Sequence, residues 1–258
     1  MAGFIYKLQN IVNITPNNNN TDINIARCLL KNVGKIKKKT SLQDISELCY
    51  TSPSSISRFC HKMGYSSFID FKADCLDVQE ELDEMILDNK VFKKIDTFTF
   101  LNNINASFLA IETDKLEKSI DKLCDMIYEA QRVFIFATHI PGDLASILQR
   151  ALLTASKNVE FYPQKEHQME LVKQIRPNDL CIFISLEGTL LMEKAITIPA
   201  IISLANIVLI TQNSQIKFSQ QFSDTIVLGS HDDESLGKYK LLFFIDCLIN
   251  RYYNKYVI

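Results

Sequence analysis

The sequence predicts an α/β protein in which an all-α N-terminal domain precedes an α/β/α sandwich with a five-stranded parallel sheet. Three observations support this prediction. Residues 1–76 contain short helical patterns of apolar residues and no convincing strand. From residue 132 onward, five apolar runs rich in β-branched and aromatic residues alternate with helical stretches. The charge also divides: residues 1–76 hold ten Lys and Arg against five Asp and Glu, a net +5, whereas the remainder holds eighteen against twenty-five, a net −7.

The composition limits the class of protein. At 258 residues, with 47% hydrophobic and 22% charged residues, the chain is expected to form one large domain or two ordinary ones. It has no apolar run near the ~20 residues that span a bilayer, and its N-terminus lacks the apolar core of a signal peptide. The seven cysteines are scattered without a C-x-x-C pair, and only four histidines occur. These features predict a cytoplasmic protein with no metal site, no cofactor and no membrane contact.

The basic N-terminal domain is expected to consist of five short helices. Thr21 or Asp22 can cap the second helix and Ser41 caps the third. Ser52 caps the fourth helix, which has Pro53 at its first position, where the missing N–H costs little. The expected helices cover residues 3–12, 22–33, 42–49, 53–63 and 66–76.

The chain is expected to divide into three parts: residues 1–76, residues 77–131 and residues 132–258. The middle part contains linking and packing helices, expected at residues 77–86, 98–111 and 114–130. The strands are expected at residues 132–137, 158–162, 179–185, 206–211 and 224–229, and a last helix at residues 236–253. The strands are continuous apolar runs, which is typical of a parallel sheet covered by helices on both faces.

The fourth helix lies in the stretch TSPSSISRFCHKMGYSSF, residues 51–68, and has two chemically different faces. At 100° per residue, one face is apolar and is expected to pack on the preceding helix: Ile56, Phe59, Cys60 and Met63. The opposite face has hydroxyls and cations and no acid: Ser54, Arg58 and His61, flanked by Ser57 and Lys62. Such groups suit phosphates and base edges, and two short helices joined by a tight turn form the helix-turn-helix pattern. The alternative interpretation is a solvated helix in a small bundle.

Residues 41–75, SLQDISELCYTSPSSISRFCHKMGYSSFIDFKADC, resemble the DNA-binding domain of the RpiR-type bacterial transcriptional regulators. The resemblance extends from residue 1 to about residue 76, and Cys49 departs from the alanine usual in that family. It implies a helix-turn-helix that reads double-stranded DNA as a homodimer or higher homo-oligomer. The helix face and the resemblance together predict these DNA-contacting residues: Ser52, Ser54, Ser55, Ser57, Arg58, His61, Lys62 and, at a phosphate, Lys72.

The C-terminal half is expected to contain a ligand site. With the strand order 2-1-3-4-5, ligands bind beyond the carboxyl ends of the first and third strands, here residues 137–145 and 185–193. The RpiR-type regulators join their DNA-binding domain to a sugar-isomerase-like (SIS) domain that binds phosphosugars, and the five-strand pattern is similar to it. The SIS pattern is Gly-x-Gly-x-Ser after the first strand and Ser-x-Ser-Gly-x-Thr after the third. This chain retains Ser185, Gly188 and Thr189 of the second loop.

Both loops also depart from the SIS pattern. Ala137 and His139 stand where glycines are expected, and Pro141 stands near the expected serine. Glu187 replaces the second serine, and a carboxylate repels a bound anion by about 4 kcal/mol per charge pair at 4 Å and an effective dielectric of 20. A protonated His139 would offset part of this repulsion. The expected effector-contacting residues are Thr138, His139, Ser185, Glu187, Gly188, Thr189 and Glu234.

These departures are expected to close the backbone approach that a phosphate needs. They favour an altered ligand, such as an amino sugar or a neutral or cationic metabolite, or a vestigial pocket in a dimerisation unit, over retained phosphate binding. A carboxylate at a helix start is also explained by the helix dipole alone.

The function predicted from the sequence is a DNA-binding transcriptional regulator of sugar or amino-sugar metabolism genes. A small metabolite, with a sugar phosphate among the candidates, is expected to modulate its DNA binding. The alternative is a sugar-phosphate isomerase or other SIS-fold enzyme, with an acid/base pair drawn from Glu187, Glu234 and His139. No catalytic motif supports the enzyme, Glu234 is equally explained as a helix cap, and an enzyme would not need the N-terminal domain.

Overall fold

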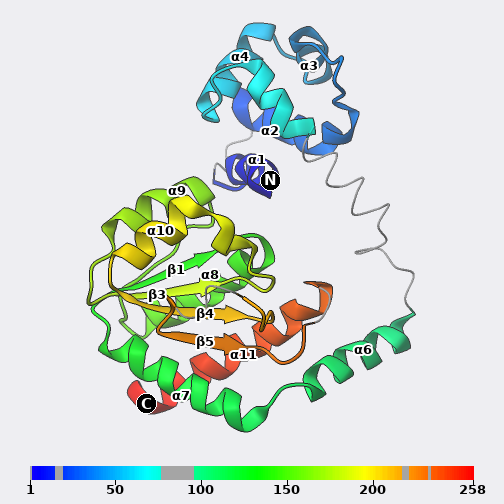
Figure 1. The fold of residues 1–258 in the computed structure, drawn as a ribbon. Helices are drawn as coiled ribbons and strands as arrows, with labels where there is room; N and C mark the ends of the chain where they lie inside the picture. The colour runs from blue at the N-terminus through cyan, green and yellow to red at the C-terminus, as the bar shows by residue number, and fades with distance from the viewer. Residues whose placement is uncertain (1, 15–19, 77–95, 217–220, 232–233) are drawn as a thin grey trace. The chain divides into compact units, whose positions relative to one another are not determined.

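The computed structural model describes residues 2–14, 20–76, 96–216, 221–231 and 234–258 (Figure 1). The chain forms two compact units, Met1–Lys93 and Lys94–Ile258. The helix expected at residues 77–86 lies outside the described residues.

The N-terminal unit is helical, as the sequence predicts. Its labelled helices are α1 (Ala2–Ile14), α2 (Thr21–Asn32), α3 (Leu42–Leu48) and α4 (Pro53–Lys62), with a 3₁₀ turn at Val33–Lys35 and further helix at residues 68–76. Ser41 and Ser52 cap α3 and α4 as expected. The cap of α2 differs from the expectation: Asn20 accepts the hydrogen bond from the Asp22 N–H at 2.9 Å. The side-chain amide oxygen of Asn20 therefore caps the helix, which begins at Thr21.

The core of the N-terminal unit forms around Phe71, which is fully buried. The rings of Phe4, Phe59, Tyr65 and Phe68 lie 5.4–6.5 Å from the Phe71 ring, measured between centroids. The predicted apolar face of the fourth helix is confirmed, since Ile56, Phe59, Cys60 and Met63 are all buried in this core. The opposite face of α4 is therefore available to solvent.

The C-terminal unit contains a parallel sheet with the expected strand order, β2-β1-β3-β4-β5. The strands are β1 (Val133–Ala137), β2 (Val159–Glu160), β3 (Leu180–Ile184), β4 (Asn206–Thr211) and β5 (Asp224–Val227). In register, Ala137 at the end of β1 pairs with Ile184 at the end of β3. The loops after these two strands therefore begin side by side.

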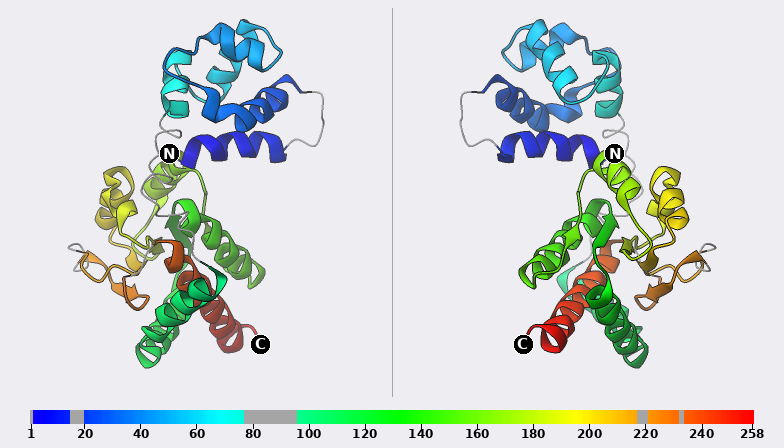
Figure 2. Two further views of the ribbon diagram at one scale, coloured as in Figure 1. Left: turned by 90° about the vertical axis from the view of Figure 1, so that its right-hand side faces the viewer. Right: turned by 90° about the vertical axis from the view of Figure 1, so that its left-hand side faces the viewer.

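Helices cover both faces of the sheet, as continuous apolar strands require (Figures 1 and 2). The helices are α6 (Thr97–Leu109), α7 (Thr113–Glu129), α8 (His139–Thr154), α9 (Lys165–Leu171), α10 (Lys194–Ile202) and α11 (Glu234–Tyr256), with 3₁₀ turns at Val172–Gln174 and Thr189–Met192. Val133 and Ile135 of β1 face the core with α7, α8 and α11, whereas Phe134 and Phe136 face the core with α9 and α10.

Two of the expected linking helices and the last helix pack together in the C-terminal unit. The second and third linking helices correspond to α6 and α7, and both pack against α11 of the sheet unit. In the last helix, the apolar side chains of Phe244, Ile245 and Leu248 are fully buried in their own unit and are not available for a dimer surface. Leu242 and Phe243 of α11 are more exposed, at 37% and 41%. Among the described residues, no helix is long and apolar enough to cross a membrane.

Candidate DNA-binding surface and effector pocket

Helix α4 presents the side chains that the sequence predicts for DNA contact. Ser54, Arg58, His61 and Lys62 are exposed, and Ser55 and Ser57 are half-buried. The face is positioned by the burial of the opposite side and by the Ser52 cap, whose hydroxyl accepts from the Ser55 N–H at 3.2 Å. The structure thus brings the predicted α4 residues together on one surface.

A hydroxyl network orders the start of α4. The Ser52 hydroxyl lies 2.9 Å from the hydroxyl oxygens of both Ser54 and Ser55. Arg58 donates from its guanidinium to the Ser55 hydroxyl at 3.5 Å. One turn later, the His61 ring contacts the Tyr65 carbonyl at 3.0 Å through Nδ1. Because a carbonyl only accepts, Nδ1 carries the proton in this contact.

The two predicted lysines have partners that the sequence did not reveal. Lys62 forms an ion pair with Asp22 of α2, so an acid from another helix reaches the edge of the acid-free α4 face. The Lys62 side chain is 71% exposed, and such surface pairs contribute only about 0–1 kcal/mol, so a phosphate can replace Asp22. Lys72 donates to the carbonyls of Lys38 and Thr40 at 3.1 and 3.2 Å and thereby holds the basic connector between α2 and α3.

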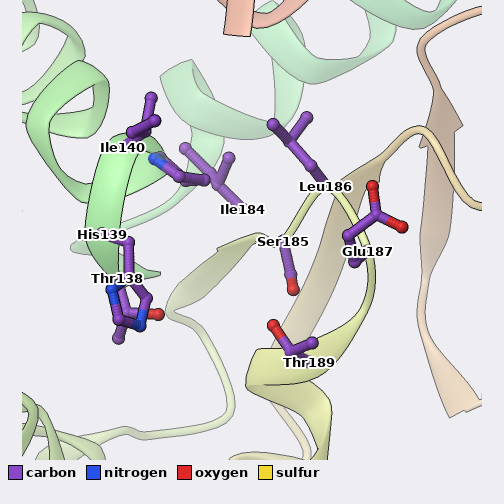
Figure 3. Close-up of a pocket in the computed structure, with 9 residues that line it drawn as sticks. Thr138, His139, Ile140, Ile184, Ser185, Leu186, Glu187 and Thr189 are labelled. Carbon is purple, nitrogen blue, oxygen red and sulfur yellow. The ribbon is translucent and has the colours of Figure 1, made fainter. Parts of the chain in front are cut away.

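A small pocket lies where the strand order predicts it, beyond the carboxyl ends of β1 and β3 (Figure 3). It has a volume of about 90 Å³. Its lining residues are Thr138, His139, Ile140, Pro141, Ile184, Ser185, Leu186, Glu187 and Thr189. Sites that enclose a whole small-molecule ligand typically measure ~300–1,000 Å³. A pocket of this size suits one compact group of a ligand that extends outward.

The backbone of both loops retains the turns that glycine would favour. Gly188 has a φ of 85°, and His139 has a φ of 59°, in the left-handed region. Histidine enters this region more readily than most non-glycine residues. The loss of glycine at position 139 therefore still allows a left-handed turn, and the closed backbone approach expected from the sequence stays a prediction. Compared with the glycine of the SIS pattern, His139 adds an imidazole to the lining of the pocket.

Two hydroxyls form one wall of the pocket. Figure 3 shows the hydroxyl oxygens of Ser185 and Thr189 directed toward one another, with His139 on the facing wall. Ser185 is buried, and its hydroxyl accepts from the Leu190 N–H at 3.2 Å. Thr189 opens the 3₁₀ turn directly after Gly188. Hydroxyls and the start of a helical turn are groups that bind phosphate oxygens.

Glu187 lies at the edge of the pocket and is directed away from the two hydroxyls (Figure 3). Its Oε1 accepts a hydrogen bond from Gln212 Nε2 at 2.5 Å, and its Oε2 contacts the His231 ring. Glu187 is thereby paired with His231, from the loop after β5. The repulsion expected between Glu187 and a bound anion is reduced by both its direction and its partners.

Sequence reasoning missed Gln212 and His231. Gln212 directly follows β4, and His231 comes four residues after the end of β5. The carboxyl ends of parallel strands meet at one edge of the sheet, so the strand prediction contained the signal that could have found them. Glu234, also predicted, begins α11, but its side chain lies outside the described residues.

Comparison with known proteins supports both parts of the fold. Residues 6–82 match the model of the helix-turn-helix domain of the rpiR family. An uncharacterized HTH-type transcriptional regulator in the aarA 3′ region of Providencia stuartii is 23% identical over 192 residues, covering 73% of this chain and 67% of that protein.

Two solved structures are similar to this chain. The Vibrio vulnificus NanR protein complexed with ManNAc-6P has a TM-score of 0.50 and 15% identity, covering 98% of this chain and 92% of that one. This likeness shows a shared fold. The sugar isomerase domain of an RpiR transcription factor from Sphaerobacter thermophilus has a TM-score of 0.48 and 15% identity, covering 60% of this chain and 86% of that one.

Proposed function

We propose that this chain, whose N-terminal unit contains the helix-turn-helix domain of the rpiR family, is a bacterial transcriptional regulator that binds DNA through α4 and a sugar phosphate through the pocket at β1 and β3. The observation that supports it most is the match of residues 6–82 to that family, on a unit whose α4 exposes hydroxyls and cations. As a DNA-binding protein it acts in the cytoplasm, on genes of sugar or amino-sugar metabolism.

The DNA-binding step follows from the chemistry of α4. The Ser52 hydroxyl network lies at the start of the helix, where backbone N–H groups and the helix dipole favour a phosphate. Arg58 lies one turn further along the exposed face and has the planar donors that pair with guanine in the major groove. Ser52, Ser54 and Lys62 position the helix on the backbone, and Arg58 contributes base preference.

The effector step follows from the geometry of the pocket. Ser185, Thr189 and the turn at Gly188 provide phosphate-binding groups, and Glu187 is turned away and paired. This geometry favours retained phosphate binding over the altered or vestigial pocket expected from the sequence. NanR, which shares the fold, is described with ManNAc-6P, and we infer a ligand of the same class here, an amino-sugar or hexose phosphate. The sugar extends out of the 90 Å³ pocket.

DNA binding is tested with Arg58→Ala and Lys62→Ala, measured by fluorescence anisotropy on a duplex selected by the full-length protein. Arg58→Ala is expected to lose about 1–3 kcal/mol of affinity for the selected site and to relax its base preference. Lys62→Ala is expected to weaken binding to all sequences alike. Lys118→Ala, an exposed lysine of α7, removes the same charge from the other unit and serves as the control. Unchanged affinity in both α4 variants contradicts the proposal.

Effector binding is tested by calorimetric titration with N-acetylmannosamine 6-phosphate and hexose 6-phosphates. The wild type is expected to bind at least one of them, to melt at higher temperature with it, and to lose binding in Ser185→Ala. Glu187→Ser is expected to leave binding unchanged or to tighten it, because it removes a negative charge near the anion. Binding of a neutral or cationic sugar in preference to every phosphate, weakened by Glu187→Ser, would show that the pocket has been altered.

A further inference from the structure

A polar groove runs along α2 in the N-terminal unit, on residues that the helix-turn-helix assignment does not use. It has a volume of about 610 Å³ and lies between α2 and the turn that joins α3 to α4. Thr21, Asn24, Cys28 and Lys31 line it at spacings of three and four residues, which places them on one face of α2. Tyr50 and Thr51 of the turn line the opposite side.

The groove is cationic. Arg27 and Lys31 are the two charged residues among its described lining residues, and the other polar groups there are hydroxyls, amides and the thiols of Cys28 and Cys49. The nearest carboxylate of α2, Asp22, is paired with Lys62 of α4. Among the described residues that line the groove, two are positively charged and none is a carboxylate, a composition suited to an anionic chain.

The groove borders the DNA-reading helix at both ends. Thr51 lines the groove and directly precedes Ser52, the cap of α4. At the other end, the Lys62–Asp22 ion pair joins the end of α4 to the start of α2. The polar face of α2 and the exposed face of α4 are therefore neighbours, and a strand that contacts one can continue onto the other.

Tyr50 is held in an unusual state beside this groove. Its side chain is 98% exposed, and its φ of 51° is in the left-handed region that bulky residues rarely adopt. A large aromatic side chain that is both strained and unburied contributes little to the core. Such strain occurs at functional sites more than elsewhere, and a phenol is a donor to phosphate oxygens.

We propose that the groove along α2 binds the sugar-phosphate backbone of the DNA beside the bases read by α4, with Arg27 and Lys31 at phosphates and the Tyr50 hydroxyl donating to a phosphate oxygen. The proposal rests on the proposed DNA-binding function and adds a second, sequence-independent contact surface to it. Backbone contacts of this kind set the register of the protein on the duplex.

The first test measures affinity against salt concentration for Lys31→Ala and Tyr50→Asn, with Lys118→Ala as the control of equal charge. Lys31→Ala is expected to reduce the slope of log K against log salt by about one, and affinity at 0.1 M salt on the order of eightfold, for selected and unrelated duplexes alike. Asparagine tolerates the left-handed region, so Tyr50→Asn is expected to fold normally and still lose affinity.

The second test uses Cys28, a half-buried thiol that lines the groove, as a footprint. Alkylation by N-ethylmaleimide, followed by mass spectrometry, is expected to slow several-fold at Cys28 when DNA is bound. Cys247, a half-buried thiol of the other unit, is the internal control and is expected to react at the same rate.

The outcomes separate this inference from the proposed function. The groove inference is overturned, and the proposed function stands, if Arg58→Ala loses affinity for DNA while Lys31→Ala and Tyr50→Asn bind DNA as the wild type does. In that case the alkylation rate of Cys28 is also the same with and without DNA. If the wild type binds no duplex under low salt, the proposed function fails and this inference fails with it.

Discussion

His231 lies against the carboxylate of Glu187, although 44 residues separate them in the chain. Glu187 follows β3 and His231 follows β5, so the contact joins two loops at the carboxyl edge of the sheet. The Glu187 side chain is 20% exposed and the His231 side chain 55%. The pair turns the one carboxylate among the pocket's described lining residues away from the Ser185 and Thr189 hydroxyls.

His231→Ala is expected to weaken sugar-phosphate binding. Without the imidazole, Glu187 loses one of its two partners and its charge acts more strongly on the bound anion. We expect a cost of roughly 1 kcal/mol, about fivefold in Kd, because the pair is partly exposed. Calorimetry on a double-mutant cycle checks this: Glu187→Gln in the His231→Ala background is expected to restore binding. His167→Ala, an exposed histidine outside the pocket lining, is the control. Additive effects of the two pocket substitutions contradict the coupling.

We expect the protein to be a homodimer, since a helix-turn-helix usually reads two half-sites about one DNA turn apart. The exposed apolar residues of α6 offer a surface for it: Phe98, Leu101 and Leu109 are 73%, 53% and 88% exposed. Leu101→Lys is expected to raise the dimer dissociation constant about tenfold or more, in line with the cost of losing a central apolar contact.

Analytical ultracentrifugation at micromolar concentration checks the dimer. Asn102→Lys adds the same charge at the neighbouring exposed position of α6 and is the control. A wild-type monomer, with and without DNA, refutes the homodimer. Equal effects of the two lysine substitutions place the interface elsewhere.

Ser52→Ala is expected to destabilise α4 by about 1 kcal/mol, because the Ser52 hydroxyl accepts from the Ser55 N–H at the start of the helix. Native-state hydrogen exchange of the α4 amides measures this directly. Ser54→Ala removes a neighbouring exposed hydroxyl that does not cap the backbone, and it is expected to weaken DNA binding with little change in exchange. Equal destabilisation by both variants is incompatible with Ser52 being the cap.

The stability of α3 is expected to fall at acidic pH. The Ser41 backbone N–H, and then its hydroxyl, donate to Asp44 and hold the pKa of that carboxyl below its usual value of 3.8. A carboxyl with a lowered pKa in the folded state contributes stability above its unfolded value, and the contribution is lost as the pH falls through the folded value. Hydrogen exchange of the α3 amides between pH 5 and roughly pH 2 checks this. Asp44→Asn is expected to remove the loss of α3 stability between these pH values. A pH dependence that is the same in Asp44→Asn and in the wild type contradicts this prediction.

The sequence by itself determined the elements and their faces. The five strands and the apolar face of α4 with Ile56 and Phe59 follow from the pattern of apolar residues, which records locally which side of an element is buried. The strand order 2-1-3-4-5 was expected from the doubly wound fold class. The position of the pocket after β1 and β3 follows from the same information, because a parallel sheet brings the carboxyl ends of its strands to one edge.

Only the tertiary structure decided which polar groups meet. The Lys62–Asp22 pair spans 40 residues and the Glu187–His231 pair spans 44. Neither pair has a periodic signal, because a charge on a surface or loop is compatible with many partners until packing brings two of them together. The left-handed φ of His139 at the start of α8 likewise became visible only in the folded structure. For this reason the two faces of α4 could be predicted from local pattern, while the electrostatics of the pocket beyond β1 and β3 could not.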